Sequence, residues 1–349
     1  MKKVLLPEAS ENLRYYRANL HCHSTISDGA KTVEQLKADY MAHGYSVIAF
    51  TDHEVFITHN DLTDENFLAM NGYEFSFNGK SDDPDEDGKT CHICLVALDK
   101  NITEAVCCHR TKYLWGNAAK LRDQMDFDDT LPDFEREYNP ECINEVIRRG
   151  KEGGFFVTYN HPYWSIETYP EYSQYEGMDA MEVINFGCIA VGYDDDNDHC
   201  YEELLRQKKR LYCIGTDDNH NRHDDENPLC DSYGGFTMIA SPSLKYEDIA
   251  AALKNGQFYT STGNYKNVGP EIKSIVYEDG KVTIKTSPCR TINYIPNRRA
   301  CVAAQANDGE YITEARFDVK DNVSWFRFTA VDEKGYKAFS NAYFTDELK

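Results

Sequence analysis

The chain of 349 residues has no long hydrophobic run, and this absence excludes a first class of proteins. No segment approaches the roughly 18 consecutive apolar residues that a membrane-spanning helix needs. The apolar run near the amino terminus, Val4-Leu5-Leu6, is too short for the core of a secretory signal. We therefore expect a cytoplasmic protein with no membrane partner.

Positive charge is also scarce. The chain has 37 Lys and Arg against 59 Asp and Glu, which gives a formal net charge of −22. A field of that sign repels nucleic-acid backbones and anionic membranes, so we expect no nucleic-acid polymer as a partner. A phosphorylated small molecule would need a locally positive site, which bound divalent cations can provide.

Cysteines are present, but not in the arrangement of a structural zinc site. Cys91 and Cys94 form one C-x-x-C pair, and no second pair accompanies it. Most of the twelve cysteines lie inside apolar runs. We expect reduced thiols, as in a cytoplasmic protein, rather than disulfides.

The segment from about Asn19 to Ser261 alternates short β-rich runs with helical patterns, which is typical of βα units around a mainly parallel sheet. The first unit is the clearest. A strand over 17–22 precedes a helix that Thr32 and Gln35 open as a capping box and Gly44 ends. Further strands are expected at 45–50, 93–98, 155–159, 180–185, 211–215 and 236–240, and helices at 141–151, 199–209 and 246–255.

Beyond Gly263 the pattern changes to strands separated by turn signals such as Asp279-Gly280. Strands over 271–287, 291–295, 315–319 and 325–331 predict a small antiparallel β domain. The expected domains are therefore an α/β domain over 1–262 and a β domain over 263–349. Residues 99–140 fit the βα rhythm poorly, and we interpret them as an insertion over the site.

Histidines and carboxylates collect where the predicted strands end. His21 and His23 close the first strand and, being two residues apart, face the same way. The carboxyl ends of parallel strands meet on one face of a sheet, where ligands bind. His92 is the exception, because it lies at the amino end of its apolar run; its strand must run the other way, or the residue must enter from a loop. The candidate metal ligands are His21, His23, Asp28, His53, Glu74, His92, His161, Asp218 and His220.

This donor set predicts more than one metal ion. Mixed imidazole and carboxylate donors suit Zn, Mn or Fe. Nine donors exceed the four that one tetrahedral ion takes, so two or three closely spaced divalent ions are the better count.

In their order, these motifs resemble those of the PHP (polymerase and histidinol phosphatase) family: His21-x-His23, Asp28-Gly29, Thr51-Asp52-His53, Glu74, His92, His161-Pro162 and Asp218-x-His220. The resemblance covers about Arg17 to Ser261. It implies a distorted (β/α)7 barrel, similar to a TIM barrel, with a trinuclear metal site and phosphoesterase activity. The tail resembles the β extension of two-domain members, including the carbaryl-hydrolase-like metallohydrolases.

One motif departs from the family pattern. The usual Gly-Ser-Asp-x-His is replaced by Gly215-Thr-Asp-Asp-Asn-His220, which leaves Asp217 or Asp218 as the ligand. The spacing to His220 favours Asp218.

The resemblance also implies a role for each matched position. It places His21, His23 and Asp218 on one ion, with Glu74 bridging to another. It places Asp28, His53 and His220 on a second ion, and His92 and His161 on a third. The predicted catalytic residues are Glu74, Asp52 and His161, with Asp52 orienting His53. The candidate substrate contacts are Arg222, His223 and Tyr163.

The leading hypothesis is a phosphomonoesterase acting on a small molecule such as a nucleotide or sugar phosphate. A metal-bound hydroxide would attack phosphorus in line with the leaving oxygen. The same nucleophile can attack carbon, so the alternative is an ester, amide or carbamate hydrolase. Arg or Lys beside the metals would favour phosphate, whereas an apolar pocket would favour a carbonyl substrate. A non-catalytic scaffold ranks last, because the donor set is complete.

Overall fold

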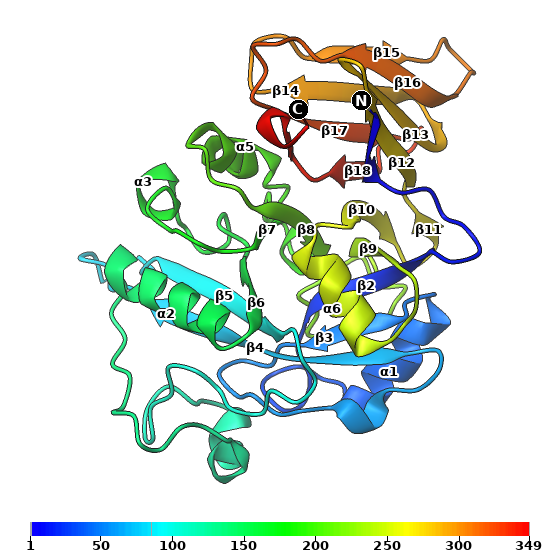
Figure 1. Ribbon diagram of the computed structural model, residues 1–349. Helices are drawn as coiled ribbons and strands as arrows, with labels where there is room; N and C mark the ends of the chain where they lie inside the picture. Colours follow the sequence, from blue (N-terminus) through cyan, green and yellow to red (C-terminus); the bar gives the residue numbers. More distant parts are fainter. Residues whose placement is uncertain (1, 85, 349) are drawn as a thin grey trace.

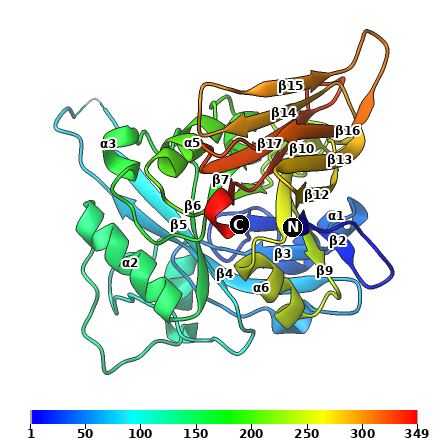
Figure 2. The same cartoon turned by 45° about the horizontal axis from the view of Figure 1, so that its top comes forward.

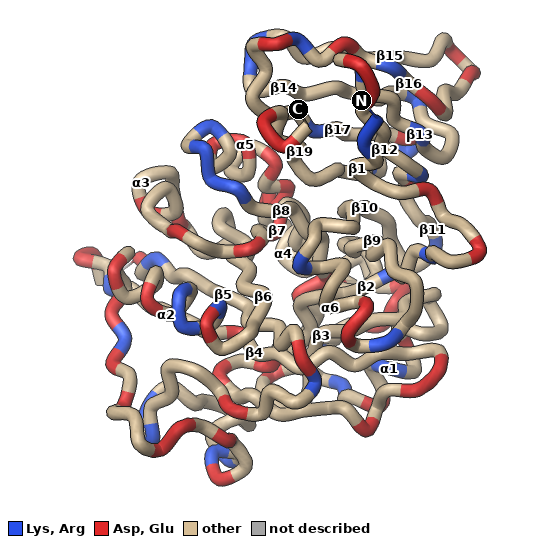
Figure 3. The backbone as a smooth tube through the Cα atoms, in the orientation of Figure 1, with Lys and Arg blue, Asp and Glu red and all other residues tan. Residues whose placement is uncertain are grey.

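The computed structural model describes residues 2–84 and 86–348. It is a mixed α/β protein with one large sheet and a second, four-stranded antiparallel sheet (Figure 1). No helix in the described ranges is long and apolar enough to cross a membrane. Asp and Glu are spread along the whole chain, with Lys and Arg interspersed among them (Figure 3).

One half of the large sheet carries the histidines and carboxylates. In the order in which they pair, its strands are β9 (Gly235–Ser241), β2 (Arg14–Cys22), β3 (Val47–Phe50), β4 (Leu68–Asn78), β5 (Thr90–Ala97), β6 (Phe155–Tyr159), β7 (Ala180–Asn185) and β8 (Tyr212–Thr216). The pairs β2–β3, β3–β4, β6–β7 and β7–β8 are parallel. Most of this half is therefore parallel, as predicted.

Strand β5 runs antiparallel to both of its neighbours, and this direction explains His92. His92 pairs with Ser76, near the carboxyl end of β4. Because β5 is reversed, its amino end lies at the edge where β4 and β6 end. The first of the two alternatives for His92, a strand that runs the other way, is confirmed.

The long helices lie where the sequence predicts them. Helix α1 (Val33–Ala42) opens with the capping box: Thr32 Oγ1 accepts a bond from the Gln35 N–H, and Gln35 Oε1 accepts one from the Thr32 N–H. Helices α2 (Pro140–Glu152), α5 (Asp198–Arg206) and α6 (Tyr246–Lys254) follow, although α5 ends earlier than predicted. The short elements α3 (Tyr169–Tyr172), α4 (Phe186–Ala190), η1 (Asn60–Leu62), η2 (Ala118–Gln124) and η3 (Thr345–Glu347) were not predicted.

The segment after β8 returns to β2. The backbone N–H of Asp218 donates to the carbonyl of His21 (3.0 Å), and that of His23 donates to the carbonyl of Asn219 (3.2 Å). Cys22 and Asn219 form a parallel bridge. The two motifs that lie furthest apart in the sequence are thus joined backbone to backbone.

The carboxyl-terminal strands are antiparallel, as predicted (Figures 1 and 2). The amino-terminal strand β1 (Lys2–Leu6) also pairs here, with β12. Asp279 (φ 49°) and Gly280 (φ 76°) form the predicted turn, which divides the expected strand 271–287 in two. The strands are β10 (Phe258–Asn264), β11 (Asn267–Val268), β12 (Ile272–Glu278), β13 (Lys281–Cys289), β14 (Thr291–Pro296), β15 (Val302–Gln305), β16 (Ile312–Asp318), β17 (Trp325–Val331), β18 (Lys337–Ser340) and β19 (Tyr343–Phe344).

A buried carboxyl group, Glu167, is held by three tyrosines near the outer face of β6. Its oxygens accept hydrogen bonds from the hydroxyls of Tyr138 (2.7 Å), Tyr159 (2.6 Å) and Tyr175. Burial raises the pKa of Glu167 from 4.5 to about 7, although the tyrosine hydrogen bonds lower it. The folded protein therefore holds this proton more tightly than an exposed glutamate does.

We expect Glu167 to make the protein less stable as the pH rises from about 4.5 to about 7. The unfolded chain releases the proton at the lower pH, whereas the folded chain keeps it until about pH 7, so the folded form binds more protons across this window. The shift corresponds to about 3 kcal/mol of unfolding free energy. Denaturant unfolding of the wild type and of Glu167→Gln should show their difference changing by that amount across the window; a constant difference would contradict the assignment.

Candidate metal centre

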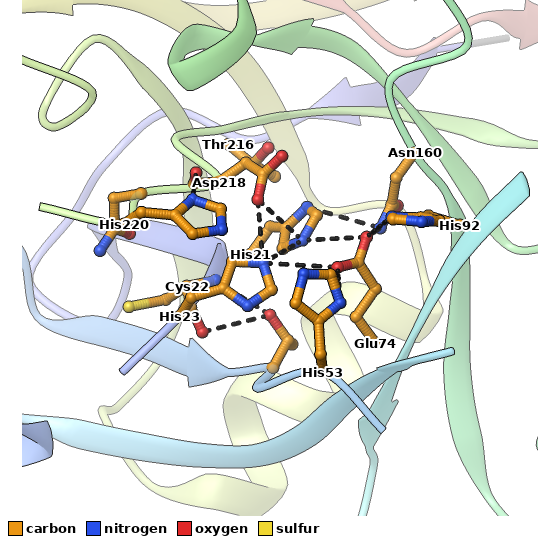
Figure 4. Close-up of polar contacts among 12 residues, drawn as sticks. His21, Cys22, His23, His53, Glu74, His92, Asn160, Thr216, Asp218 and His220 are labelled. Carbon is orange, nitrogen blue, oxygen red and sulfur yellow. Dashed lines mark hydrogen bonds and ion pairs between the residues drawn. The ribbon is translucent and has the colours of Figure 1, made fainter. Parts of the chain in front are cut away.

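All nine predicted ligands converge on one cluster. Figure 4 labels His21, His23, His53, Glu74, His92, Asp218 and His220 among them. Their donor atoms fall into overlapping groups whose members lie within 4.8 Å of one another. The groups are His21, His23, Glu74 and Asp218; His23, Asp28, His53 and His220; His53, Glu74 and His92; and His21, His161 and Glu182. Shared members link the groups, as a multinuclear site requires.

Glu74, from β4, lies at the centre of the cluster and is almost fully buried. Its two carboxylate oxygens lie 3.0–3.4 Å from imidazole nitrogens of five histidines: His21, His23, His53, His92 and His161. A carboxylate that faces several imidazole groups at once is placed to bridge two ions. Glu74 therefore contacts five of the other eight predicted ligands.

The structure distinguishes between Asp218 and Asp217. Asp218 Oδ1 lies 2.9 Å from His23 Nε2 and 3.2 Å from His21 Nε2. The Asp217 carboxylate points elsewhere: it accepts bonds from the Tyr40 hydroxyl and from backbone N–H groups at positions 233, 234 and 235. Asp218 is thus the residue at the cluster, as the spacing to His220 favoured.

Asp28 lies close to His53 and His220, the two residues that were predicted to bind the second ion together with it. Its Oδ2 is 3.2 Å from His220 Nε2, and its Oδ1 is 4.0 Å from His53 Nε2. The next residue must be glycine, because a Cβ at Gly29 would lie 2.6 Å from the carbonyl oxygen of His23. The Asp28-Gly29 pair therefore lets this loop fold tightly against β2.

Asp52 does not have the role that we predicted for it. Its carboxylate accepts four hydrogen bonds, from the backbone N–H and the hydroxyl of Ser24 and of Ser27. These bonds tie the Asp52 carboxylate to the loop that carries Asp28. Asp52 therefore positions that loop rather than the His53 ring. The correction follows from geometry, because the carboxylate points towards residues 24–27.

His92 and His161 were expected to share a third ion. Their rings are adjacent, with centroids 5.0 Å apart, and both contact Glu74 Oε1. The tightest donor groups nevertheless separate them, because His92 groups with His53 and His161 groups with His21.

Two of the donors lie at strained backbone positions. His161 has φ 26° and Asp218 has φ 50°, values that non-glycine residues rarely adopt. Hydrogen bonds fix both: the His161 N–H donates to Glu182 Oε2 (2.9 Å), and the Asp218 N–H donates to the His21 carbonyl (3.0 Å). Strain held in place in this way is typical of functional sites.

The carboxylates of the cluster stabilise positive charge on the groups around them. Burial lowers the pKa of His23, but hydrogen bonds and charges from Asp218 and Glu74 outweigh it and raise that pKa to about 10. The pKa of His161 rises to about 9 against the same burial. The pKa of His92 falls to about 4, because burial there outweighs Glu74. Divalent cations would neutralise the carboxylates in place of the protons on the histidines.

An unpaired buried polar atom in the cluster also fits a metal site. The buried atom His23 Nδ1 has no hydrogen-bond partner in residues 2–84 and 86–348. Leaving such atoms unpaired is costly unless a ligand satisfies them. The chemistry of the set, imidazole and carboxylate, suits Zn, Mn or Fe.

Sequence reasoning missed Glu182, a buried carboxylate on β7. Its Oε1 lies 2.7 Å from His21 Nδ1 and accepts a bond from the Thr216 hydroxyl, while its Oε2 accepts bonds from the His161 N–H and from Asn185 Nδ2. Asn185 Nδ2 also donates to Asp218 Oδ2 (3.0 Å). A charged residue inside an otherwise apolar strand was the signal that could have identified it.

We expect Glu182→Gln to weaken metal binding by about 10- to 100-fold, because groups that orient metal ligands contribute that much. A glutamine offers an amide N–H where the carboxylate now accepts bonds from His21 or from the backbone of His161. Titration against a chelating dye measures the affinity. Glu167→Gln, the same change at a buried glutamate away from the cluster, is the matched control. Equal affinities in the two variants would show that Glu182 does not position His21.

A pocket of about 610 Å³ opens onto the cluster. Arg222 and His223, two of the predicted substrate contacts, line it, and Arg222 Nη2 lies 3.4 Å from Asp28 Oδ2. Tyr163, the third predicted contact, does not line the pocket and is 57% exposed. The next residue, Trp164, lines the pocket instead. Trp115 lines the pocket as well, so the insertion over 99–140 does reach the site.

Comparisons with known proteins add the following findings. No family model and no curated protein matches the chain. Among solved structures, a two-domain protein from Bacteroides vulgatus that contains a predicted PHP-like metal-dependent phosphoesterase is similar over 97% of this chain and 98% of that one, with 15% identity and a TM-score of 0.44.

Two shorter structures are similar over part of the chain. A candidate metal-dependent phosphoesterase from Bifidobacterium adolescentis aligns over 60% of this chain and 90% of its own, with 16% identity and a TM-score of 0.37. An amidohydrolase from Chromobacterium violaceum with bound sulfate aligns over 61% and 93%, with 17% identity and a TM-score of 0.35. At these identities and TM-scores, function has to be argued from the site itself.

Proposed function

We propose that this protein is a metal-dependent phosphoesterase of the PHP type that hydrolyses a small-molecule phosphate monoester, such as a nucleotide or sugar phosphate. The observation that carries the proposal is the convergence of nine imidazole and carboxylate donors around Glu74. The return of residues 218–219 to β2 supports the distorted barrel that the resemblance implies.

The donor groups support a site for two or three ions, with Zn, Mn or Fe as the suited metals. Ions bound there would supply a hydroxide nucleophile at neutral pH and neutralise charge on the phosphoryl oxygens. Glu74 would bridge ions, and Asp218 would hold one of them together with His21 and His23. Glu182 and Asp52 act through others: Glu182 fixes His21 and the backbone of His161, and Asp52 fixes the loop of Asp28.

One cationic side chain on the pocket wall supports phosphate as the group that is cleaved. Arg222 is the one Arg or Lys among the pocket-lining residues within the described ranges, and His223 lies next to it in the chain. The Arg222 side chain is 65% exposed and its guanidinium is close to Asp28, so it can turn from that carboxylate to an incoming anion. Arg222 and the bound cations would thus provide the positive charge that a phosphate needs at the site.

A second candidate function is hydrolysis of an ester, amide or carbamate at the same cluster. The apolar side chains of Trp115, Trp164, Val191 and Leu229 on the pocket wall favour it. A carbonyl substrate would use the same nucleophile and would not need Arg222.

The direct test is release of inorganic phosphate from a panel of nucleotides and sugar phosphates, run beside matched carboxylate esters and carbamates. We expect phosphate release that a chelator abolishes and added metal restores. Arg222→Leu should lower kcat/KM for phosphates more than for carboxylate esters. Metal-dependent cleavage of esters without any phosphate release would favour the second function instead.

A further inference from the structure

The pocket above the metal cluster is bordered by two tryptophans. The chain has three, and Trp325 is buried in the core at 2% exposure. Trp115 and Trp164 are 45% and 37% exposed, and both line this pocket. A large aromatic side chain that stays exposed beside a polar cluster marks a binding surface.

Each tryptophan lies against different histidines of the cluster. The Trp115 ring centroid is 5.1 Å from that of His53. The Trp164 ring centroid is 5.4 Å from that of His92 and 5.0 Å from that of His161. A group bound at the metals is therefore within reach of both indole rings.

Both tryptophans are attached to well-held loops. The backbone N–H of Trp164 donates to the carboxylate of Asp195, a buried residue (3.1 Å). Asn117, two residues after Trp115, donates from Nδ2 to the carbonyl of Thr25, in the loop that carries Asp28 (3.2 Å). The backbone beside each ring is thus tied to the site by a hydrogen bond, which limits the ordering that binding a flat group there requires.

We infer that Trp115 and Trp164 hold a planar aromatic ring on the leaving group of the substrate. This inference rests on the proposed phosphoesterase function and narrows its substrate class to phosphate monoesters that carry a nucleobase or an aryl ring. The pocket of about 610 Å³ has the size of a site for a molecule of nucleotide dimensions. Stacking rewards any flat π surface, so both sources of the ring share one chemistry.

The test compares substrates that differ only in the ring. Adenosine 5′-monophosphate and ribose 5-phosphate differ by the base, and benzyl phosphate and cyclohexylmethyl phosphate, which both release a primary alcohol, differ by the planarity of the ring. In the metal-loaded wild type we expect kcat/KM to favour the planar member of each pair. Trp115→Leu and Trp164→Leu, which stay apolar but lose the π face, should each reduce that preference by about 5- to 100-fold. Tyr311→Leu, at an exposed aromatic residue of the carboxyl-terminal strands, is the control and should keep it.

The two pairs also identify the source of the ring. A preference in the nucleotide pair that exceeds the one in the benzyl pair indicates a nucleobase, and the reverse indicates a simple aryl group. An equal loss of activity on planar and non-planar substrates in both leucine variants would mean that the tryptophans only pack, and would overturn the inference.

Fluorescence separates failure of the inference from failure of the proposed function. Adenosine 5′-monophosphate should quench tryptophan emission of the metal-loaded protein, whereas ribose 5-phosphate should not. The double variant Trp115→Phe and Trp164→Phe leaves only the buried Trp325 and should lose this quenching. Quenching without phosphate release from any substrate would leave the ring site standing and contradict the phosphoesterase. Phosphate release without ring-selective quenching would support the phosphoesterase and contradict the ring site.

Discussion

Replacing Glu74 with glutamine is expected to lower kcat/KM by at least about 1,000-fold, because a bridging ligand contributes several kcal/mol through the ions it holds. The two Glu74 oxygens face five imidazoles, and glutamine offers one neutral oxygen in the same volume. Its amide would also present donors to imidazole nitrogens that need an acceptor or a cation. We therefore expect metal content and activity to fall together.

The measurement is the metal content of Glu74→Gln beside phosphate release, with circular dichroism to show that the fold is retained. Glu167→Gln is the matched control, because it makes the same change at a buried glutamate that tyrosines hold instead of histidines. Glu74→Gln with full metal content and unchanged turnover would rule out the bridging role.

The neighbouring variants Asp218→Asn and Asp217→Asn are expected to fail in opposite ways. Asp218 contacts His21 and His23 in the cluster, so Asp218→Asn should lose about 1,000-fold or more in activity and keep its fold. Asp217 accepts backbone N–H groups after residue 232, and an asparagine there leaves buried donors unpaired. Asp217→Asn should therefore cost about 1–3 kcal/mol of unfolding free energy.

Unfolding of the metal-free proteins and activity of the metal-loaded proteins should be measured side by side for this pair. The expected pattern is an inactive, stable Asp218→Asn and an active, less stable Asp217→Asn below its unfolding temperature. The reverse pattern would mean that Asp217, and not Asp218, is the ligand.

The donor set could be predicted because its signals are local. His21 and His23, or Asp218 and His220, lie two residues apart at the end of an apolar run, and the ends of neighbouring strands meet in any such sheet. The capping box at Thr32 is equally local and was also predicted. These features need no knowledge of which strands pair.

The features that were missed or left open depend on contacts between distant segments. The direction of β5 was left open between two alternatives, although a clue was present. A parallel crossover needs a dozen or more residues, usually a helix, and only the acidic loop 79–89 separates β4 from β5. The position of Trp115 relative to the cluster follows from tertiary packing alone, whereas Glu182 had one signal in the sequence, its charge inside an otherwise apolar strand. Asp52 was assigned to the wrong neighbour because sequence adjacency to His53 says nothing about where its side chain points.

The count of bound metal tests the central claim most directly. Protein purified without a chelator should contain two or three equivalents of Zn, Mn or Fe per chain, as its donor count requires. Removal of that metal should abolish phosphate release, and its return should restore it. A folded wild-type chain that binds no divalent metal under any loading condition would contradict the account, because the nine converging donors would then bind no metal ion.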